Sequence, residues 1–154
     1  MSMNAKAVFF DRDGVLNVDV AYLYKIDDLK WIDGALEAVA YLTKQGYKIF
    51  IVTNQSGIAR GYYTVEQMDE LHTYMCRAIE HAGGKIEKIY FCPHHPEGKV
   101  AEYTGVCDCR KPKPGMLNMP LIKKSPFSSA IVSVMWRRLK LQELKAICSK
   151  AAIY

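Results

Sequence analysis

The sequence of 154 residues has no long apolar segment and no leader-like N-terminus. No apolar run approaches the roughly 18 residues that a helix needs to span a bilayer. Residues 1–6 show no charged stretch followed by an apolar run and a small-residue cleavage site, which is the pattern of a secretory signal. We therefore expect a cytoplasmic protein that does not contact membranes. Apolar residues make up 50% of the chain and charged residues 24%, the balance of a folded domain rather than a disordered one.

Carboxylates are scarce near the C-terminus, where Glu143 is the only acidic residue after Asp108. The net charge of +5 is therefore unevenly distributed. Residues 1–118 carry 14 Lys and Arg against 15 Asp and Glu, whereas residues 119–154 carry seven against one. We predict one domain over residues 1–118, followed by an atypical basic C-terminal segment over residues 119–154. Because no linker or repeat is visible, we expect a monomer.

Apolar runs that alternate with helical patterns predict the fold class. Three runs rich in β-branched and aromatic residues are typical of buried strands: residues 5–10, 47–53 and 88–92. Between them, helices are predicted over residues 34–45 and from Thr64 to just before Gly83. Asp33 is the expected N-cap of the first helix, and Thr64-Val-Glu-Gln67 has the capping-box pattern. We predict an α/β fold with a doubly wound, Rossmann-like parallel sheet covered on both faces.

Polar residues follow the first two predicted strands, at the sheet edge where ligands of such folds bind. Asp11-Arg-Asp13-Gly14 brings two carboxylates, which can act as nucleophile and proton carrier or hold Mg2+. Thr53-Asn54-Gln55 brings hydroxyl and amide donors that can cradle a phosphate. Taken singly, each pattern is also that of an ordinary polar turn.

Cations and thiols follow the third strand. Arg110 and Lys111 lie beside prolines and suit an anionic substrate, although a solvated basic turn has the same composition. Four soft ligands lie within eighteen residues and match a tetrahedral Zn2+ site: Cys92, His94, Cys107 and Cys109. His95 is an alternative to His94. We expect no disulfides in the cytoplasm, and Cys76 and Cys148, which lie apart, are predicted to be buried thiols.

Taken in order, these motifs resemble the haloacid dehalogenase superfamily of phosphatases. The similar segments are residues 10–17, 52–58, 92–95 and 107–112. The pattern is closest to the zinc-containing branch with histidinol-phosphatase and D-glycero-D-manno-heptose 1,7-bisphosphate phosphatase, and it covers roughly residues 6–117. This resemblance implies a fold without a large cap domain, in which the zinc loop, residues 92–109, shapes the pocket instead.

The resemblance also implies a role for each motif residue. Asp11 would be the nucleophile that forms an aspartyl-phosphate, Asp13 the general acid and base, and both would bind Mg2+. Lys111 would offset negative charge. The remaining implied roles are phosphoryl binding by Thr53 and Asn54, and substrate contacts by Arg110, Asn17, Gln55 and Arg60. The implied substrate is a sugar phosphate, preferably the 7-phosphate of heptose 1,7-bisphosphate in lipopolysaccharide core biosynthesis, with histidinol phosphate as the alternative.

Two other functions compete with this interpretation. A zinc-stabilised nucleic-acid-binding module could use the basic tail, but residues 1–118 are slightly acidic, so we expect no nucleic-acid partner. A catalytically impaired relative that binds sugar phosphates is the other alternative, because part of the family pattern is missing after Leu117.

The departure lies in the C-terminal segment. The family continues with a helix, a fourth apolar strand and a Gly-Asp loop with a further acidic residue for Mg2+, and we expect the strand and the loop to be missing or altered here. Where the acidic loop should fall, the chain reads Ser133-Val-Met-Trp-Arg-Arg138. Read one base earlier, these codons permit Gly-Asp-Val-Glu-Glu, of which only the valine is forced. Our hypothesis is a frameshift after Leu117, which predicts low or no activity; the alternative is a divergent relative with a genuine basic tail.

Overall fold

The computed structural model describes residues 7–117 and 131–134. The strands are β1 (Ala7–Phe10), β2 (Lys48–Asn54), β3 (Lys88–Cys92) and β4 (Ile131–Val134). The helices are α1 (Ala35–Lys44) and α2 (Val65–His81), with short 3-10 turns η1 (Ile26–Asp28) and η2 (Ala101–Tyr103) in the loops. In the part of the chain that the structure describes, no helix is long and apolar enough to cross a bilayer.

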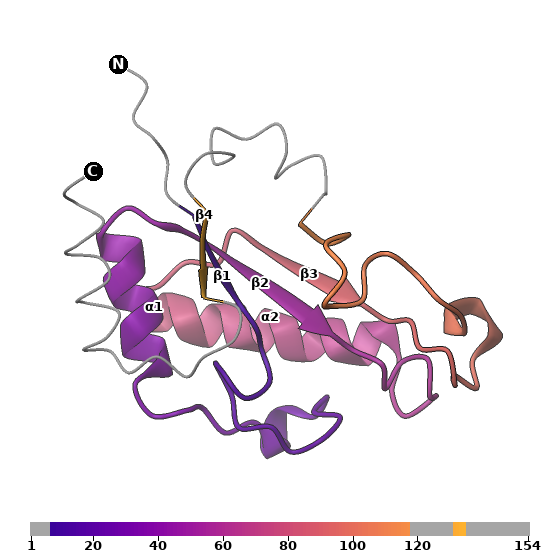
Figure 1. The fold of residues 1–154 in the computed structure, drawn as a ribbon. Helices are drawn as coiled ribbons and strands as arrows, with labels where there is room; N and C mark the ends of the chain where they lie inside the picture. The colour runs from indigo at the N-terminus through magenta and orange to yellow at the C-terminus, as the bar shows by residue number, and fades with distance from the viewer. Residues whose placement is uncertain (1–6, 118–130, 135–154) are drawn as a thin grey trace.

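The strands form one parallel sheet in the order β3-β2-β1-β4 (Figure 1). β1 therefore lies inside the sheet, paired with β2 on one side and β4 on the other. All four of its residues are buried, as expected of a central strand. The α/β fold class and the three predicted strands are confirmed. The chain moves outward from β1 to β3 and then returns to the other side of β1, so Asp11 follows the strand at which the direction reverses.

Both described helices lie on the same face of the sheet, where Val8, Ile49 and Ile51 pack against Val39 of α1 and Ile79 of α2. The expectation that helices cover both faces is thus not met within the described residues. The reason is topological: successive right-handed crossovers that move in one direction place their helices on one side. On the opposite face, Phe9 and Phe50 stack with ring centroids 5.1 Å apart, and Met116 packs beside them.

The ends of the helices agree with the predictions, with one correction. The capping box is present: the Thr64 side chain accepts from the Gln67 N–H, and the Gln67 side chain accepts from the Thr64 N–H. Asp33 is not the cap of α1. That position is held by Gly34, whose φ of 82° is a left-handed conformation that glycine adopts without strain.

The fourth strand is a second correction. We expected the C-terminal strand to be missing or altered, but the backbone of β4 pairs with β1 in register from Ala7↔Ile131 to Phe10↔Val134. The expectation of a missing strand was therefore wrong. Of residues 133–138, where the acidic loop should fall, the last four lie outside the described residues, so the frameshift hypothesis itself stays a prediction.

Candidate active site and metal centre

A cleft of about 480 Å³ lies at the carboxyl ends of β1 and β2. Its lining residues are Asp11, Asp13, Asp19, Ala21, Tyr22, Asn54, Gln55, Ser56, Tyr63 and Lys111. Five of them lie at or just after the end of β1 or β2, as the sequence predicted. The loop around Tyr22 was not predicted from the sequence; Ala21 and Tyr22 both have a positive φ, 55° and 58°. The cleft combines carboxylates, amides and one ammonium group, which is the chemistry of an anion site.

Asp11 and Lys111 form a close ion pair in this cleft. The Lys111 Nζ lies 2.7 Å from Asp11 Oδ2, and the Lys111 side chain is only 7% exposed. The same ammonium donates to the carbonyl of Val52 at 3.1 Å. Asn54 fixes the backbone of Lys111 from both sides, because its Oδ1 accepts from the Lys111 N–H and its Nδ2 donates to the Lys111 carbonyl. Segments 57 positions apart in sequence are thus joined at one point.

Asp13 is held by donors on both carboxylate oxygens. Its Oδ1 accepts from the Arg12 guanidinium at 3.0 and 3.2 Å and from Asn17 Nδ2 at 3.0 Å. Its Oδ2 accepts from Gln55 Nε2 at 3.1 Å. Asn17 is fully buried, so it lies behind Asp13 rather than in the cleft. The position of Asn17 suits orientation of Asp13, and the substrate contact expected from the sequence stays a prediction.

Gln55 lies at the centre of a second network. Its Nε2 also donates to Thr53 Oγ1 at 2.8 Å, and its Oε1 accepts from the Tyr63 hydroxyl at 2.6 Å. Gln55 is 2% exposed and Thr53 1%. Burial raises the pKa of Tyr63 to about 12, so its hydroxyl stays protonated at neutral pH. Tyr63 is a site residue that the sequence analysis missed, since nothing in its local pattern marks it.

Arg12 was also missed, although it lies between the two aspartates. The side chain is fully buried, and besides Asp13 it contacts His72 Nε2 of α2 at 3.1 Å and donates to the Leu23 carbonyl at 2.9 Å. Burial, followed by the nearby guanidinium, lowers the pKa of His72 to about 3. A neutral imidazole can accept the hydrogen bond from Arg12. No local pattern in the sequence marks this pairing, because the partners are 60 residues apart.

The two predicted substrate-contacting arginines lie apart from the cleft lining. Arg60 Nη2 lies 3.2 Å from His95 Nε2, and the charges of Arg60 and Arg110 both help burial to lower the pKa of His95. Among the described residues, no hydrogen-bond partner reaches the buried Arg60 Nε or Arg110 Nη1. Arg60, His95 and Arg110 therefore form a basic group outside the cleft, beside the predicted zinc ligands.

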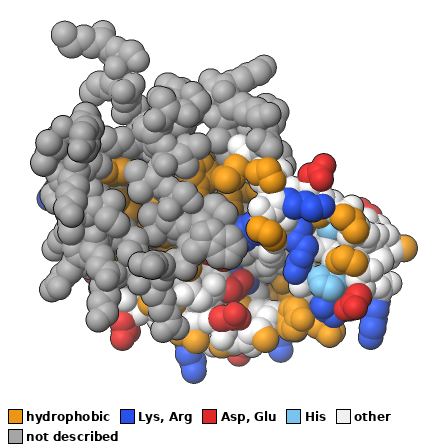
Figure 2. All heavy atoms as spheres, viewed as in Figure 1, with side chains coloured by type: hydrophobic (Ala, Val, Ile, Leu, Met, Phe, Trp, Pro, Cys, Tyr) orange, Lys and Arg blue, Asp and Glu red, His pale blue; other side chains and the backbone are white. Residues whose placement is uncertain are grey.

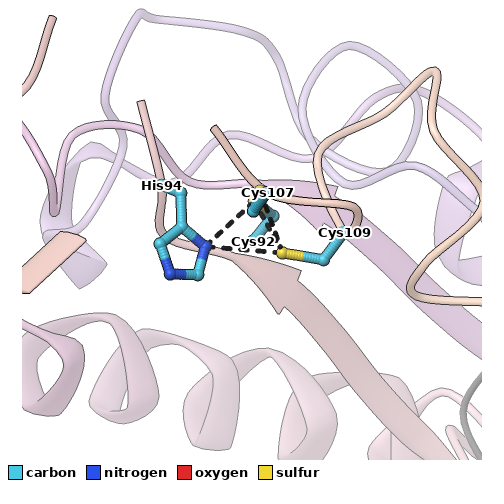
Figure 3. A group of neighbouring side chains, drawn as sticks. All are labelled: Cys92, His94, Cys107 and Cys109. Atoms are coloured by element: carbon cyan, nitrogen blue, oxygen red, sulfur yellow. Dashed lines mark hydrogen bonds between the residues drawn. The ribbon is translucent and has the colours of Figure 1, made fainter. Parts of the chain in front are cut away.

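Three thiols and one imidazole converge at the end of β3 and in the loops that follow it (Figure 3). The sulfurs of Cys92, Cys107 and Cys109 lie 3.1–3.4 Å from one another, and the thiols are free. His94 Nδ1 lies 3.4 Å from the Cys109 sulfur. All four ligand atoms lie within 4.8 Å of one another, so the group can hold a metal ion. The His95 imidazole is directed at Arg60 instead, which favours His94 as the fourth ligand.

Cys76 does not match its prediction fully. It is partly exposed on α2 rather than buried, although burial still raises the pKa of its thiol. Cys148 lies outside the described residues.

On the face seen in Figure 2, acidic and basic side chains lie interspersed over the described surface. This face of the described part has no uniform basic stripe of the kind that duplex binding needs.

An open parallel sheet with an Asp-x-Asp loop after its central strand and a lysine on the first aspartate defines a haloacid dehalogenase-type phosphatase fold. Known proteins of similar sequence identify the particular family. Residues 6–133 match the family model for polynucleotide kinase 3 phosphatase. A D-glycero-β-D-manno-heptose 1,7-bisphosphate 7-phosphatase from Haemophilus influenzae is 46% identical over 143 residues, which is 92% of this chain and 74% of that protein. The chain belongs to the family of this relative, the D-glycero-β-D-manno-heptose 1,7-bisphosphate 7-phosphatases.

Two further relatives agree. The 7-phosphatase of Yersinia pestis is 48% identical over 117 residues, which is 76% of this chain. A crystal structure of the D,D-heptose 1,7-bisphosphate phosphatase from B. bronchiseptica, complexed with magnesium and phosphate, is similar with a TM-score of 0.63 and 38% identity over 72% of this chain. The chain spans 62% of the length of the Yersinia relative and 59% of that crystallised chain.

Proposed function

We propose that the chain carries the active site of a phosphatase that hydrolyses sugar phosphate monoesters, with the 7-phosphate of D-glycero-D-manno-heptose 1,7-bisphosphate as the preferred substrate. The observation that supports this most directly is the Asp11–Lys111 ion pair beside Asp13 in one cleft. A buried ammonium against one of two neighbouring carboxylates suits attack on a phosphate ester, because it offsets the charge of both nucleophile and phosphate.

The chemistry proceeds in two displacements. An Asp11 carboxylate oxygen attacks phosphorus, the phosphorus–oxygen ester bond breaks, and the leaving sugar oxygen takes a proton from Asp13. Asp13 then takes a proton from water, whose oxygen attacks the phosphorus of the aspartyl-phosphate; the bond between phosphorus and the Asp11 oxygen breaks, which releases phosphate and returns the Asp11 carboxylate. Thr53, the backbone of Asn54 and Lys111 bind the phosphoryl oxygens. Arg12 and Asn17 keep Asp13 directed at the leaving oxygen.

Asp11 and Asp13 suit a hard divalent cation. Mg2+ is usually bound in such sites through one or two carboxylates, waters and the substrate phosphate, and both aspartates line the cleft. When bound, Mg2+ would neutralise charge on the phosphoryl oxygens. Donors already occupy both oxygens of Asp13, so we expect Asp11 to be the more available side-chain ligand. Mg2+ complexed by the B. bronchiseptica relative supports this proposal.

The thiol and imidazole cluster is proposed as a structural Zn2+ site formed by Cys92, His94, Cys107 and Cys109. In a tetrahedral zinc site with bonds of about 2.3 Å, thiolate sulfurs lie roughly 3.7 Å apart, close to the spacings found. The ligand Cys109 directly precedes Arg110 and Lys111, so the site would position both cations. Its role is structural rather than catalytic.

The basic group of Arg60, His95 and Arg110 is proposed to bind the non-reacting part of the substrate. Arg60 Nε and Arg110 Nη1 are buried, and the charge of the two guanidinium groups suits pairing with a second anionic group at their other nitrogens. A bisphosphate substrate supplies such a group, whereas histidinol phosphate does not. This difference favours heptose bisphosphate over the alternative.

Residues 1–118 are proposed as the phosphatase domain and residues 119–154 as an altered segment that lowers its activity. Beyond Asp108 the sequence offers only Glu143 as a further acidic metal ligand. A catalytically impaired relative therefore stays the second candidate for the chain as it stands. We also propose that it acts in the cytoplasm as a monomer.

A panel of phosphate esters tests the substrate class. Phosphate release by the chain that carries the shifted-frame acidic sequence after Leu117 is measured with Mg2+ from heptose 1,7-bisphosphate, histidinol phosphate and a 3′-phosphorylated oligonucleotide, beside an Asp11→Asn control. We expect the bisphosphate to have the highest kcat/KM and Arg110→Ala to reduce that preference. Faster release from the oligonucleotide or from histidinol phosphate would overturn the substrate assignment.

A further inference from the structure

We propose that Tyr63 is a positioning residue: its hydroxyl fixes the orientation of the Gln55 side-chain amide, and this amide in turn orients both Asp13 and Thr53. The inference rests on the proposed function for its catalytic meaning, but the hydrogen-bond geometry stands independently of it. Neither Tyr63 nor Gln55 then needs to contact the substrate.

The Gln55 amide has a hydrogen-bond partner at each of its two ends. The Tyr63 hydroxyl donates to Oε1 at 2.6 Å and so fixes the position of the amide oxygen, while the NH2 group is directed toward the Asp13 carboxylate, which can only accept. Both N–H bonds are then used, one toward Asp13 Oδ2 at 3.1 Å and one toward Thr53 Oγ1 at 2.8 Å. With the opposite orientation, the amide oxygen would face the carboxylate oxygen Asp13 Oδ2, which has no hydrogen to donate.

Tyr63 is held firmly enough to impose this choice. The side chain is 4% exposed and stacks on Tyr24 with ring centroids 5.2 Å apart. Its ring also passes close to Gly57, where an added Cβ would lie 2.2 Å from Tyr63 Cε1. Glycine at position 57 is therefore needed for the ring to reach Gln55. Because burial keeps the hydroxyl protonated, it is a donor throughout the neutral range.

As a consequence, the Gln55 amide orients two groups of the site, the Thr53 hydroxyl and the Asp13 carboxylate. Since Thr53 Oγ1 accepts from the amide, its own hydrogen can be directed at a phosphoryl oxygen. Asp13 Oδ2 is held by the other N–H, while Arg12 and Asn17 hold Oδ1. One hydroxyl outside the predicted motifs thus determines the geometry of a phosphate donor and of the proton carrier.

A double-mutant cycle in the full chain tests this inference, with Tyr63→Phe, Gln55→Met, the pair together and Tyr74→Phe as the matched control. Tyr74 lies on α2 and is 45% exposed. The first readout is the pair of Gln55 side-chain amide resonances in ¹H–¹⁵N spectra. The second is the Kd for inorganic phosphate in the presence of Mg2+, with kcat and KM for phosphate release as a third.

We expect Tyr63→Phe to shift the Gln55 amide resonances and to speed their exchange with solvent, while Tyr74→Phe leaves them unchanged. Phosphate affinity should fall roughly five- to twentyfold in Tyr63→Phe and no further when that change is added to Gln55→Met. Unchanged resonances, or an equal loss of affinity with and without Gln55, would overturn the inference. Failure of the proposed function would be seen separately, as no phosphate release from any ester by the chain that carries the shifted-frame acidic sequence after Leu117.

Discussion

At the residue scale, the charge on Lys111 is the feature on which the proposed chemistry depends most. The ammonium lies 2.7 Å from Asp11 in a nearly buried position, where an ion pair is little screened by water. Lys111→Met keeps most of the side-chain length and removes the charge. We expect kcat for phosphate release to fall by at least about 100-fold. The control is Lys99→Met, at an exposed position, and an equal fall in both variants would contradict the assignment.

His72 makes stability depend on pH. Its pKa is about 3 in the folded chain and about 6.5 when unfolded, so the unfolded state binds the proton more readily. This contribution is present in full above pH 6.5 and is lost as the pH falls toward 3. The free energy of unfolding should drop by about 2 kcal/mol between pH 7 and pH 5 from this residue.

Denaturant unfolding at the two pH values measures this dependence. His72→Gln, which keeps an acceptor for Arg12, should remove most of that difference, whereas His81→Gln, an exposed change at the end of α2, should retain it. If the free energy of unfolding of His72→Gln fell between pH 7 and pH 5 as much as that of the wild type, another group would be responsible.

How far single residues were predictable follows from their sequence separation. Asp11, Asp13 and Lys111 belong to local motifs, and the structure brings them together as expected. The contacts of Arg12 with His72 and of Asn54 with Lys111 join partners 60 and 57 residues apart. No local pattern encodes such pairs, because burial and packing select them. The burial of Asn17 was likewise not predictable, because its sequence neighbours do not reveal it.

At the scale of elements, the N-terminus of α2 tests the value of its capping box. Thr64→Ala removes the acceptor for the Gln67 N–H. We expect the free energy of unfolding to fall by about 1 kcal/mol, with kcat unchanged, as measured by chemical denaturation. Thr73→Ala, exposed within the same helix, should cost less. Equal costs for the two changes would contradict a capping contribution.

The loop after β3 should bind zinc through a specific set of ligands. Purified chain should contain equimolar zinc by elemental analysis, and Cys109→Ser or His94→Ala should lose it. Cys76→Ser and His95→Ala should keep it, because neither residue belongs to the converging group. Chelation should lower activity by releasing Arg110 and Lys111. Zinc retained in Cys109→Ser would refute the ligand set.

Elements were predictable where the apolar pattern was strong. The ranges for β2, β3, α1 and α2 agree with the structure to within a residue or so. Which face each helix covers was not predictable from periodicity, because it depends on the strand order β3-β2-β1-β4. The N-cap of α1 was assigned wrongly to Asp33, since the backbone turns at Gly34, one residue later.

At the scale of the whole molecule, the C-terminal segment decides whether the site is complete. β4 pairs with β1, so this segment contributes backbone to the sheet beside Asp11. A matching strand weakens the frameshift hypothesis for the residues before Met135. It supplies no acidic residue, however, and the sequence that follows is Met135-Trp-Arg-Arg138. A cation held by Asp11 and Asp13 alone should bind weakly.

The most direct measurement of the central claim is Mg2+-dependent phosphate release from heptose 1,7-bisphosphate by the chain, beside a version that carries the shifted-frame acidic tail. Each version is also tested with Asp11→Asn. We predict rapid turnover with the acidic tail, low or no turnover without it, and none in either Asp11→Asn variant. Turnover that survives Asp11→Asn, or no turnover even with the acidic tail, would contradict the proposed active site.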